Sequence, residues 1–173
     1  NLDDRLSAFV NSGYVQKPPI LDNVIDYDGN VSSNPDNEKF ISNEVGGEYR
    51  SDKVAIKGSY YNTQWKDRNL TKSVTSGQGD SGDTDIIYLT GVNQSHSGFE
   101  IESKVALHEM VELDVAVSIG DWYFDGDAEG DYLKQEYNDD NQIIGQTSEE
   151  YQYALNNLMV GDMPQKSYVG GLT

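Results

Sequence analysis

Long runs of alternating apolar and polar residues restrict most strongly how this chain can fold. In the stretch 53–74, Val54 and Ile56 fall on one side of an extended chain, and Lys57 and Ser59 on the other. A period of two is the spacing of a β-strand, because successive side chains point to opposite faces. The pattern predicts an all-β fold with strands at about 4–16, 38–50, 53–74, 85–107, 111–124 and 151–173.

The connections between these strands alternate in length. Those at 51–52 and 108–110 are short turns, whereas the long, acidic ones lie at about 17–37, 75–84 and 125–150. Much of the net charge of −18 falls in these long connections, and the last of them alone holds nine acids and one lysine. Outer-membrane β-barrels have short turns on the periplasmic side and long loops outside. The pattern therefore predicts antiparallel up-and-down strands that form part of a transmembrane barrel, with 1–173 as a single wall segment.

Two tryptophans lie at matching distances from the short turns. Trp65 follows Lys53 by 12 residues, and Trp122 follows Val111 by 11. Eleven strand residues tilted by about 40° rise roughly 28 Å, which is close to the barrel's apolar band of about 25 Å and its flanking aromatic residues. The spacing predicts that Trp65, Trp122 and Tyr123 lie at the membrane interface.

Alternation predicts which face of each strand meets lipid. Because lipid does not solvate a charge, Lys57 should point into the barrel. In 111–124 the face that contains Val115 should point outward and the face that contains Ala116 inward. Trp65 shares the face of Lys57, so its predicted place at the interface requires a β-bulge near 62–64 that shifts the register.

The stretch "DWYFDGDAEGDYLKQE" (121–136) has the residue spacing of an EF-hand calcium loop. Asp125, Asp127, Glu129 and Glu136 occupy ligand positions, and a glycine stands at the sharp turn. An EF-hand also needs a helix on each side, but the flanking residues alternate like a strand before the loop and resemble a loop after it. We therefore predict a solvated acidic loop, and the alternative left open is a loose site that binds calcium weakly.

Composition excludes several other kinds of chemistry. The sequence contains no cysteine, which excludes thiol catalysis and thiolate metal sites, and its acidity argues against nucleic-acid binding. The two histidines, His96 and His108, lie at opposite ends of one predicted strand, so they do not share a metal. We expect no metal site, no cofactor and no enzyme activity. The candidates for contact with a ligand are His96 and the loop acids Asp125, Asp127, Glu129 and Asp131.

Four stretches, 37–74, 88–102, 113–130 and 158–171, together resemble the barrel region of TonB-dependent outer-membrane receptors of the kind common in Bacteroidetes. The most specific pieces are "TQWKDR" at the end of one long strand and "GVNQSHSGFEIE" on the returning strand. The resemblance implies a barrel of 22 strands around a plug domain, and this chain, with about six strands, would be a fragment of the barrel without the plug.

The resemblance also implies a location and partners. Such receptors lie in the cell outer membrane and import siderophores, cobalamin, glycans or other scarce solutes. The implied partners are the remainder of the barrel, the plug, the TonB energy-transducing complex and outer-membrane lipid, with a surface lipoprotein as a further candidate. The alternative is a soluble, acidic, β-rich secreted adhesin or carbohydrate-binding module.

Overall fold

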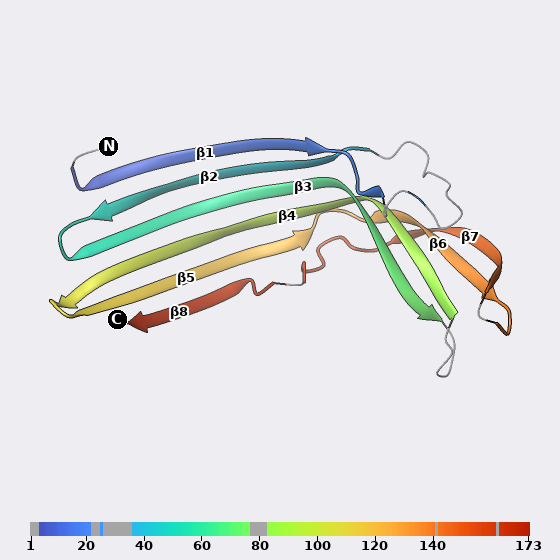
Figure 1. Ribbon diagram of the computed structural model, residues 1–173. Helices are drawn as coiled ribbons and strands as arrows, with labels where there is room; N and C mark the ends of the chain where they lie inside the picture. The colour runs from blue at the N-terminus through green and yellow to red at the C-terminus, as the bar shows by residue number, and fades with distance from the viewer. Residues whose placement is uncertain (1–3, 22–24, 26–35, 77–82, 141, 162) are drawn as a thin grey trace.

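A computed structural model describes residues 4–21, 25, 36–76, 83–140, 142–161 and 163–173. Eight β-strands account for most of them, and no helix in this part of the chain is long and apolar enough to cross a membrane. The strands are β1 (Leu6–Lys17), β2 (Glu38–Arg50), β3 (Val54–Ser76), β4 (Asp83–His108), β5 (Val111–Phe124), β6 (Ala128–Tyr137), β7 (Ile143–Tyr153) and β8 (Lys166–Leu172) (Figure 1).

All strand pairs are antiparallel, which confirms the predicted fold class. The order along the main sheet is β1-β2-β3-β4-β5-β8, and β6 pairs with β4 and with β7. The predicted short turns join β2 to β3 and β4 to β5, and in the first of them the Ser51 N–H donates to the Val54 carbonyl at 2.7 Å. The elements therefore follow the up-and-down pattern wherever a turn is short.

The structure corrects two predicted boundaries. The range 125–150, predicted to be a loop, contains β6 and most of β7, and the predicted strand 151–173 reduces to the end of β7 and the short β8. The acids misled the prediction, because Glu129, Asp131 and Glu136 are exposed strand residues. A strand outside a membrane tolerates charge on a face that meets water.

The strands form two regions, which we call the wall and the cap sheet. The wall consists of β1, β2, 54–65 of β3, 94–108 of β4, β5 and β8. The cap sheet consists of 70–76 of β3, 83–90 of β4, β6 and β7. In Figure 1 the β3–β4 hairpin turns away from the wall on the right, where β6 and β7 also lie.

A bend separates the two regions. The β3–β4 register is unbroken from Val54 to Trp65 and then shifts twice before Leu70. The chain passes between wall and cap sheet four times, and each passage contains one residue with positive φ: Asp67, Gly91, Gly126 and Asn157. Because that backbone conformation turns the chain sharply, it redirects the strands at the same level of the sheet.

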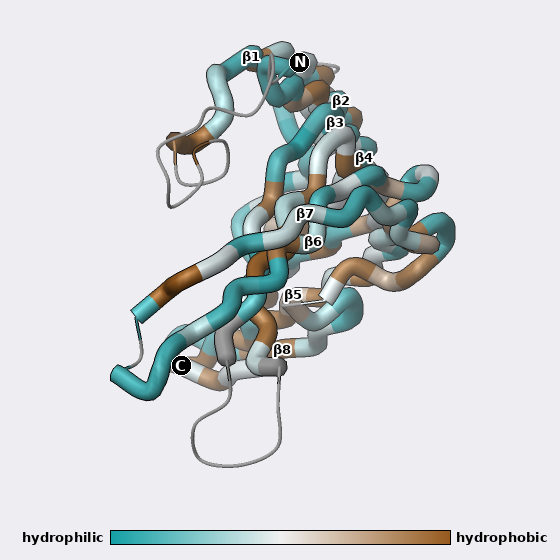
Figure 2. The backbone as a smooth tube through the Cα atoms, turned by 90° about the vertical axis from the view of Figure 1, so that its right-hand side faces the viewer, coloured by the Kyte–Doolittle hydropathy of each residue, from teal (hydrophilic) through white to brown (hydrophobic). Residues whose placement is uncertain are grey.

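From the short turns up to the row of Val10, the wall has one apolar and one polar face. The next row on the apolar side is polar and consists of Ser12, Asn43, Asn62, Ser97 and Asp121. A row across five strands of the apolar face consists of Val10, Val45, Tyr60, Phe99 and Ile119. Its neighbour on the opposite face consists of Phe9, Gly46, Ser59, Glu100 and Ser118. The apolar side chains are exposed, for example Val10 at 77% and Phe99 at 61%. Figure 2 shows the wall strands following a curved line from β1 to β8, with apolar and polar residues alternating along them.

The cap sheet buries part of its apolar residues, although Ile143 and Ile144 on β7 are exposed. Ile86 and Leu133, which face each other across β4 and β6, are 1% and 6% exposed. The buried apolar side chains of the described residues are these two, Ala128 at the start of β6 and Val92 at the bend, and none belongs to the wall. The hydrophobic core therefore lies in the cap sheet and at its junction with the wall.

Candidate functional site

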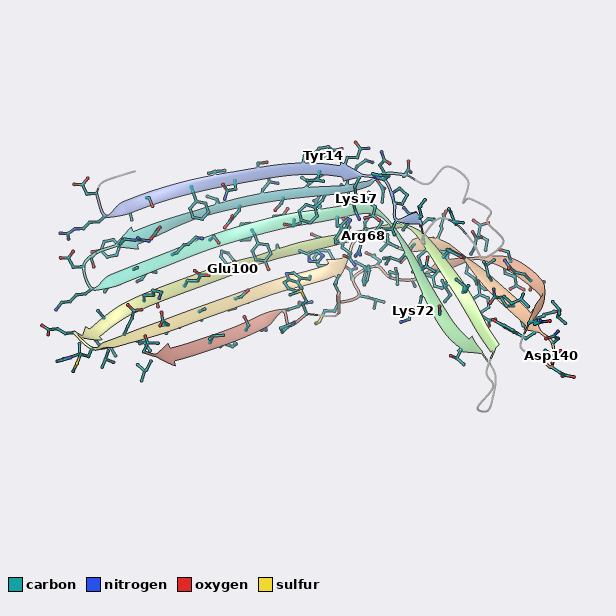
Figure 3. The ribbon with its side chains drawn as sticks, viewed as in Figure 1. Tyr14, Lys17, Arg68, Lys72, Glu100 and Asp140 are labelled. Carbon is teal, nitrogen blue, oxygen red and sulfur yellow. The ribbon has the colours of Figure 1, made fainter. Side chains whose placement is uncertain are left out.

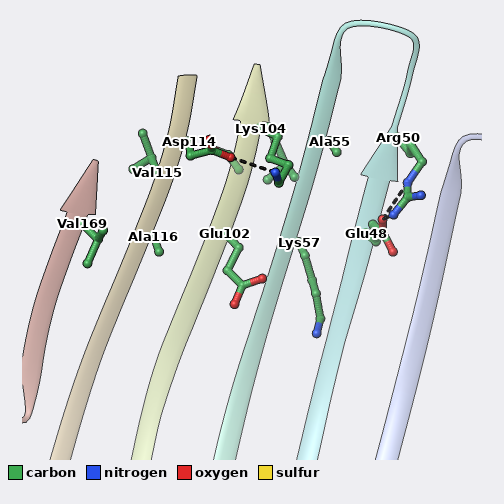
Figure 4. A pocket seen from close by; sticks show the side chains of 12 residues that line it. Glu48, Arg50, Ala55, Lys57, Glu102, Lys104, Asp114, Val115, Ala116 and Val169 are labelled. Carbon is green, nitrogen blue, oxygen red and sulfur yellow. Dashed lines mark hydrogen bonds and ion pairs between the residues drawn. The ribbon is translucent and has the colours of Figure 1, made fainter. Parts of the chain in front are cut away.

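Two hollows lie on the polar face of the wall, one near each end. The lower hollow, near the short turns, is lined largely by charged side chains that pair with one another (Figure 4). Lys104 Nζ lies 3.2 Å from Glu112 and 3.1 Å from Asp114, and Arg50 pairs with Glu48. These pairs neutralise four of the charged side chains in the lower hollow, and Lys57 and Glu102 line it outside the ion pairs.

The upper hollow lies just below the bend and has a different composition. Its volume is about 550 Å³, and side chains from four neighbouring strands line it. The lining combines aromatic rings with hydrogen-bonding groups and consists of Phe40, Ser42, Glu44, Tyr61, Thr63, Trp65, His96, Glu100, Trp122 and Met163. A concave site with aromatic walls and a few polar groups is typical of a small-ligand site.

Two aromatic rings lie against the wall inside the upper hollow. Trp122 Nε1 donates a hydrogen bond of 2.9 Å to the Tyr61 hydroxyl. Their space comes from two paired glycines: a Cβ at Gly98 would stand 2.6 Å from the Tyr61 hydroxyl oxygen, and one at Gly120 would stand 2.6 Å from Trp122 Nε1. Any larger residue at the two glycines would push these rings off the sheet. We call Tyr61 and Trp122 the aromatic platform.

Charged and polar side chains surround Trp65 at the top of the wall. Trp65 Nε1 donates to the buried Glu38 carboxylate at 3.1 Å, and Lys17 pairs with the same carboxylate at 3.0 Å. The Arg68 guanidinium lies 3.7 Å from the centre of the Trp65 ring and donates to Gln94 at 2.8 Å. Lys17 and Arg68 both lie near the end of the wall (Figure 3). The side chains of the chain itself thus occupy the space around Trp65.

His96, a predicted ligand candidate, lies in the upper hollow. Its ring centre is 5.4 Å from that of Trp122, and its Nε2 lies 3.4 Å from the Gln94 amide oxygen. His108, the other histidine, is exposed at the far end of β4. His96 can therefore position the platform and offer a hydrogen bond to a ligand.

The loop acids lie apart from this hollow. Asp125 follows β5, and the Asp127 carboxylate accepts a hydrogen bond of 3.0 Å from the Asn156 N–H. Glu129 and Asp131 lie on β6, where Glu136 has the opposite parity and therefore points to the other face. The residues at EF-hand spacing thus form a turn and a strand instead of a closed loop. Among the described residues, no three His, Asp or Glu side chains come together as a metal site would require.

The two tryptophans do not lie where the aromatic-interface prediction put them. Because no bulge interrupts 54–65, Trp65 stays on the face of Lys57, and Trp122 lies on the same polar face. Tyr123 lies on the apolar face, in one row with Tyr14 and Ile41. The face on which each tryptophan lies follows from its odd or even position along the strand, and its height along the strand does not determine that face.

Sequence reasoning missed Tyr61, Glu44 and Glu100 as members of a site. The signal in the sequence was the pair Gly98 and Gly120, since a glycine inside a strand marks a close approach of another group. Which group approaches depends on the strand register, which only the sheet provides.

Comparison with known proteins identifies one solved structure with a similar fold. No protein-family model matches the sequence, and no curated protein matches it significantly. Among solved structures, the copper transporter OprC is similar, with a TM-score of 0.54 and 15% sequence identity; the match covers 99% of this chain and 29% of that one. This identity supports the fold alone. The chain has the fold of an outer-membrane β-barrel segment and spans less than a third of the protein it matches.

Proposed function

We propose that this chain is a wall segment of an outer-membrane transport receptor of the TonB-dependent type, which takes up a scarce solute. The observation that carries the proposal is the wall itself, whose six strands have an exposed apolar face opposite a polar face with two hollows.

The exposed apolar face suits lipid as its solvent. A water-soluble sheet buries such a face, and in the cap sheet Ile86 and Leu133 are buried. Side chains such as Val45 (52% exposed), Ile101 (51%) and Tyr168 (67%) lie on this face along the wall. Apolar surface stabilises a protein by about 25 cal/mol per Å² when it leaves water, so contact with acyl chains gives this face its stabilising environment.

The orientation follows from the connections. Barrels of this kind have short periplasmic turns and long extracellular loops. The cap sheet and the upper hollow therefore lie toward the extracellular end. The polar face then lines the interior, around a plug domain and the path of the solute. The further proposed partners are the rest of the barrel, the TonB energy-transducing complex, outer-membrane lipid and a surface lipoprotein. The proposed location is the cell outer membrane, and the protein acts without catalysis.

The likeness to a copper transporter supports transport as the general activity. The residues of the upper hollow argue less for copper as the solute of this chain. The residues that line the upper hollow include one histidine and one methionine, His96 and Met163, among aromatic and hydroxyl groups. Soft copper sites favour thiolate, thioether and imidazole groups. The lining is therefore richer in groups that bind organic solutes.

Labelling of single cysteines tests the proposal. The segment contains no cysteine, so a full-length protein whose other cysteines are replaced accepts one label at a time. Val45 and Ile119 lie on the apolar face, and their neighbours Glu44 and Ser118 lie on the polar face. In lipid vesicles, labels at Val45 and Ile119 should be quenched by a lipid-bound quencher, and labels at Glu44 and Ser118 by a water-soluble one.

The reverse quenching pattern, or equal quenching of the labels on the two faces, would contradict the proposal of a membrane wall. A full-length protein that stays monodisperse without detergent or lipid would favour the secreted adhesin or carbohydrate-binding module instead. Uptake that continues after removal of TonB would leave the wall intact but would contradict the energy coupling.

A further inference from the structure

We propose that the upper hollow binds a neutral oligosaccharide, one sugar ring of which stacks on the aromatic platform of Tyr61 and Trp122. This inference rests on the proposed function, because it treats the polar face of the wall as the lining of the solute path. It adds the chemical class of the solute and the residues that contact it.

The platform is a fixed pair of aromatic rings, with His96 packed beside Trp122 at 5.4 Å between ring centres. Tyr61 and Trp122 are hydrogen-bonded to each other at 2.9 Å and lie over Gly98 and Gly120. The wall supports them from behind, and both also line the hollow. A pyranose ring has a face of C–H groups, which carry a slight positive charge and are attracted to the negative face of an aromatic ring. A supported pair of rings therefore presents a pre-formed surface to such a face.

Hydrogen-bond acceptors surround the platform. Glu44 and Glu100 line the same hollow together with Ser42 and Thr63. Among the described residues, neither carboxylate has a cationic nitrogen within 4 Å; Glu44 accepts a hydrogen bond of 3.0 Å from Asn11. Carboxylates accept from the hydroxyls around a sugar ring, and hydrogen bonds to charged groups are about twice as strong as neutral ones. A neutral polyol satisfies these acceptors without bringing a charge into the wall.

The charges in the hollow argue against the other ligand classes. An anion would meet Glu44 and Glu100 directly. A cation would compete with cations of the chain, because Arg68 and Lys17 already lie over Trp65, at 3.7 and 5.7 Å from the ring centre. The aromatic platform has no Lys or Arg over it among the described residues. The site also lies just below the cap sheet, at the end where an external solute enters.

The experiment uses the purified full-length protein in a detergent without a sugar headgroup, since a glycoside detergent would occupy the site. The probes are neutral hexasaccharides: α-1,4-, α-1,6-, β-1,3- and β-1,4-linked glucans, mannan, xylan and fructan. Spermine and an inositol phosphate serve as the cationic and anionic probes. Binding is measured by calorimetry on the original protein and on the variants Trp122→Ala, Tyr61→Ala, Tyr61→Phe and Tyr60→Ala.

Tyr60→Ala is the matched control, because Tyr60 neighbours Tyr61 on β3 but points to the apolar face, where its ring packs 4.9 Å from that of Phe99. At least one hexasaccharide should bind, and Trp122→Ala and Tyr61→Ala should each weaken it about tenfold or more, as the loss of a buried aromatic contact does. Tyr61→Phe should weaken it less, because the ring stays. Tyr60→Ala should leave affinity unchanged.

The inference fails if no hexasaccharide binds, if spermine or the inositol phosphate binds instead, or if Tyr60→Ala and Tyr61→Ala have equal effects. The single-cysteine labels at Val45 and Glu44 are placed on separate preparations, because Glu44 lines the hollow and must stay intact where sugar binding is measured. Correct labelling without sugar binding removes the inference and keeps the wall, whereas failed labelling removes the proposed function itself.

Discussion

The wall and the cap sheet share two continuous strands, β3 and β4, yet only the cap sheet and its junction with the wall bury apolar side chains among the described residues. Ile56 in the wall part of β3 is 42% exposed, whereas Ile86 in the cap part of β4 is 1% exposed. The same residue type in one long hairpin thus meets two environments. In the proposed membrane setting, the wall gains stability from an apolar surrounding, whereas the cap sheet buries apolar side chains itself.

The bend at Asp67 and Gly91 makes this difference. Below it, the strands run in register with their neighbours, and one face of the wall is apolar from the short turns up to the row of Val10. Above it, β4 exchanges its partner β5 for β6, and β6 pairs in turn with β7. A local change in backbone direction therefore separates a sheet with an exposed apolar face from a sheet with buried apolar side chains.

Truncation of isoleucine should show the largest contrast between the two regions. Ile86→Ala removes a buried side chain and leaves a cavity, at a cost of about 2–5 kcal/mol. Ile56→Ala removes an exposed one and should cost much less. Hydrogen exchange of amides in β6 and β7 measures the first effect, and unfolding in lipid vesicles the second. Equal costs would remove the distinction between the regions.

Arginine substitution tests the two faces of the wall itself. Val115→Arg puts a charge on the apolar face of β5 and should cost about 2–4 kcal/mol in a lipid-embedded barrel. Ala116→Arg points into the polar face, opposite Glu102 on the paired strand, and should cost much less. Reversible unfolding of the full-length protein in lipid gives both values. Similar costs at the two positions would contradict a membrane wall.

Alanine at Gly91 should loosen the cap sheet by a smaller amount. Gly91 has φ of +66°, and a Cβ there would meet no atom within 4 Å, so the penalty is one of backbone conformation, about 1–2 kcal/mol. Gly13→Ala, in β1, has equal space and no positive φ, and should be neutral or slightly stabilising. Faster amide exchange in the cap sheet of Gly91→Ala, with the wall unchanged, is the expected result. If amide exchange in the cap sheet of Gly91→Ala were unchanged, the positive φ at position 91 would not require glycine.

The smallest effect concerns one hydrogen bond in the cap sheet. The Tyr132 hydroxyl donates to the buried Asp85 carboxylate at 2.6 Å, and this bond, together with burial, raises the pKa of Tyr132. A raised folded-state pKa gives a stabilising contribution that is complete below the unfolded value of about 10 and is lost as pH rises through the folded value.

Protection of cap-sheet amides should therefore fall above about pH 10, and it should fall less in Tyr132→Phe, which lacks the titrating group. Tyr168→Phe is the control, because Tyr168 lies on β8 of the wall, outside the cap sheet. The same pH response in the original protein and in Tyr132→Phe would assign it to another group.

Several parts of this architecture could be read from the residues. The alternation of Val54 and Ile56 with Lys57 predicted the faces of β3, because side-chain parity is a local property of an extended chain. The turns at 51–52 and 108–110 were equally local. The hairpin of β6 and β7 was missed, since its acids suggested a solvated loop, and its pairing partner lies about 40 residues earlier in β4.

The candidate site divides in the same way. His96 was selected by its chemistry and lies in the upper hollow, whereas Asp125 and its neighbours were selected by spacing and lie outside it. The aromatic platform joins Tyr61 and Trp122, which are 61 residues apart. No local pattern pairs such residues, because their contact depends on the register of three strands.

The sequence by itself determined that the chain forms long antiparallel strands with an apolar and a polar face, because a period of two and short polar turns act over only a few residues. Only the tertiary structure decided where β3 and β4 bend, which strands continue into the cap sheet and which aromatic rings meet over Gly98 and Gly120. These features depend on hydrogen-bond register between distant segments, where a shift of one residue would turn every side chain to the other face.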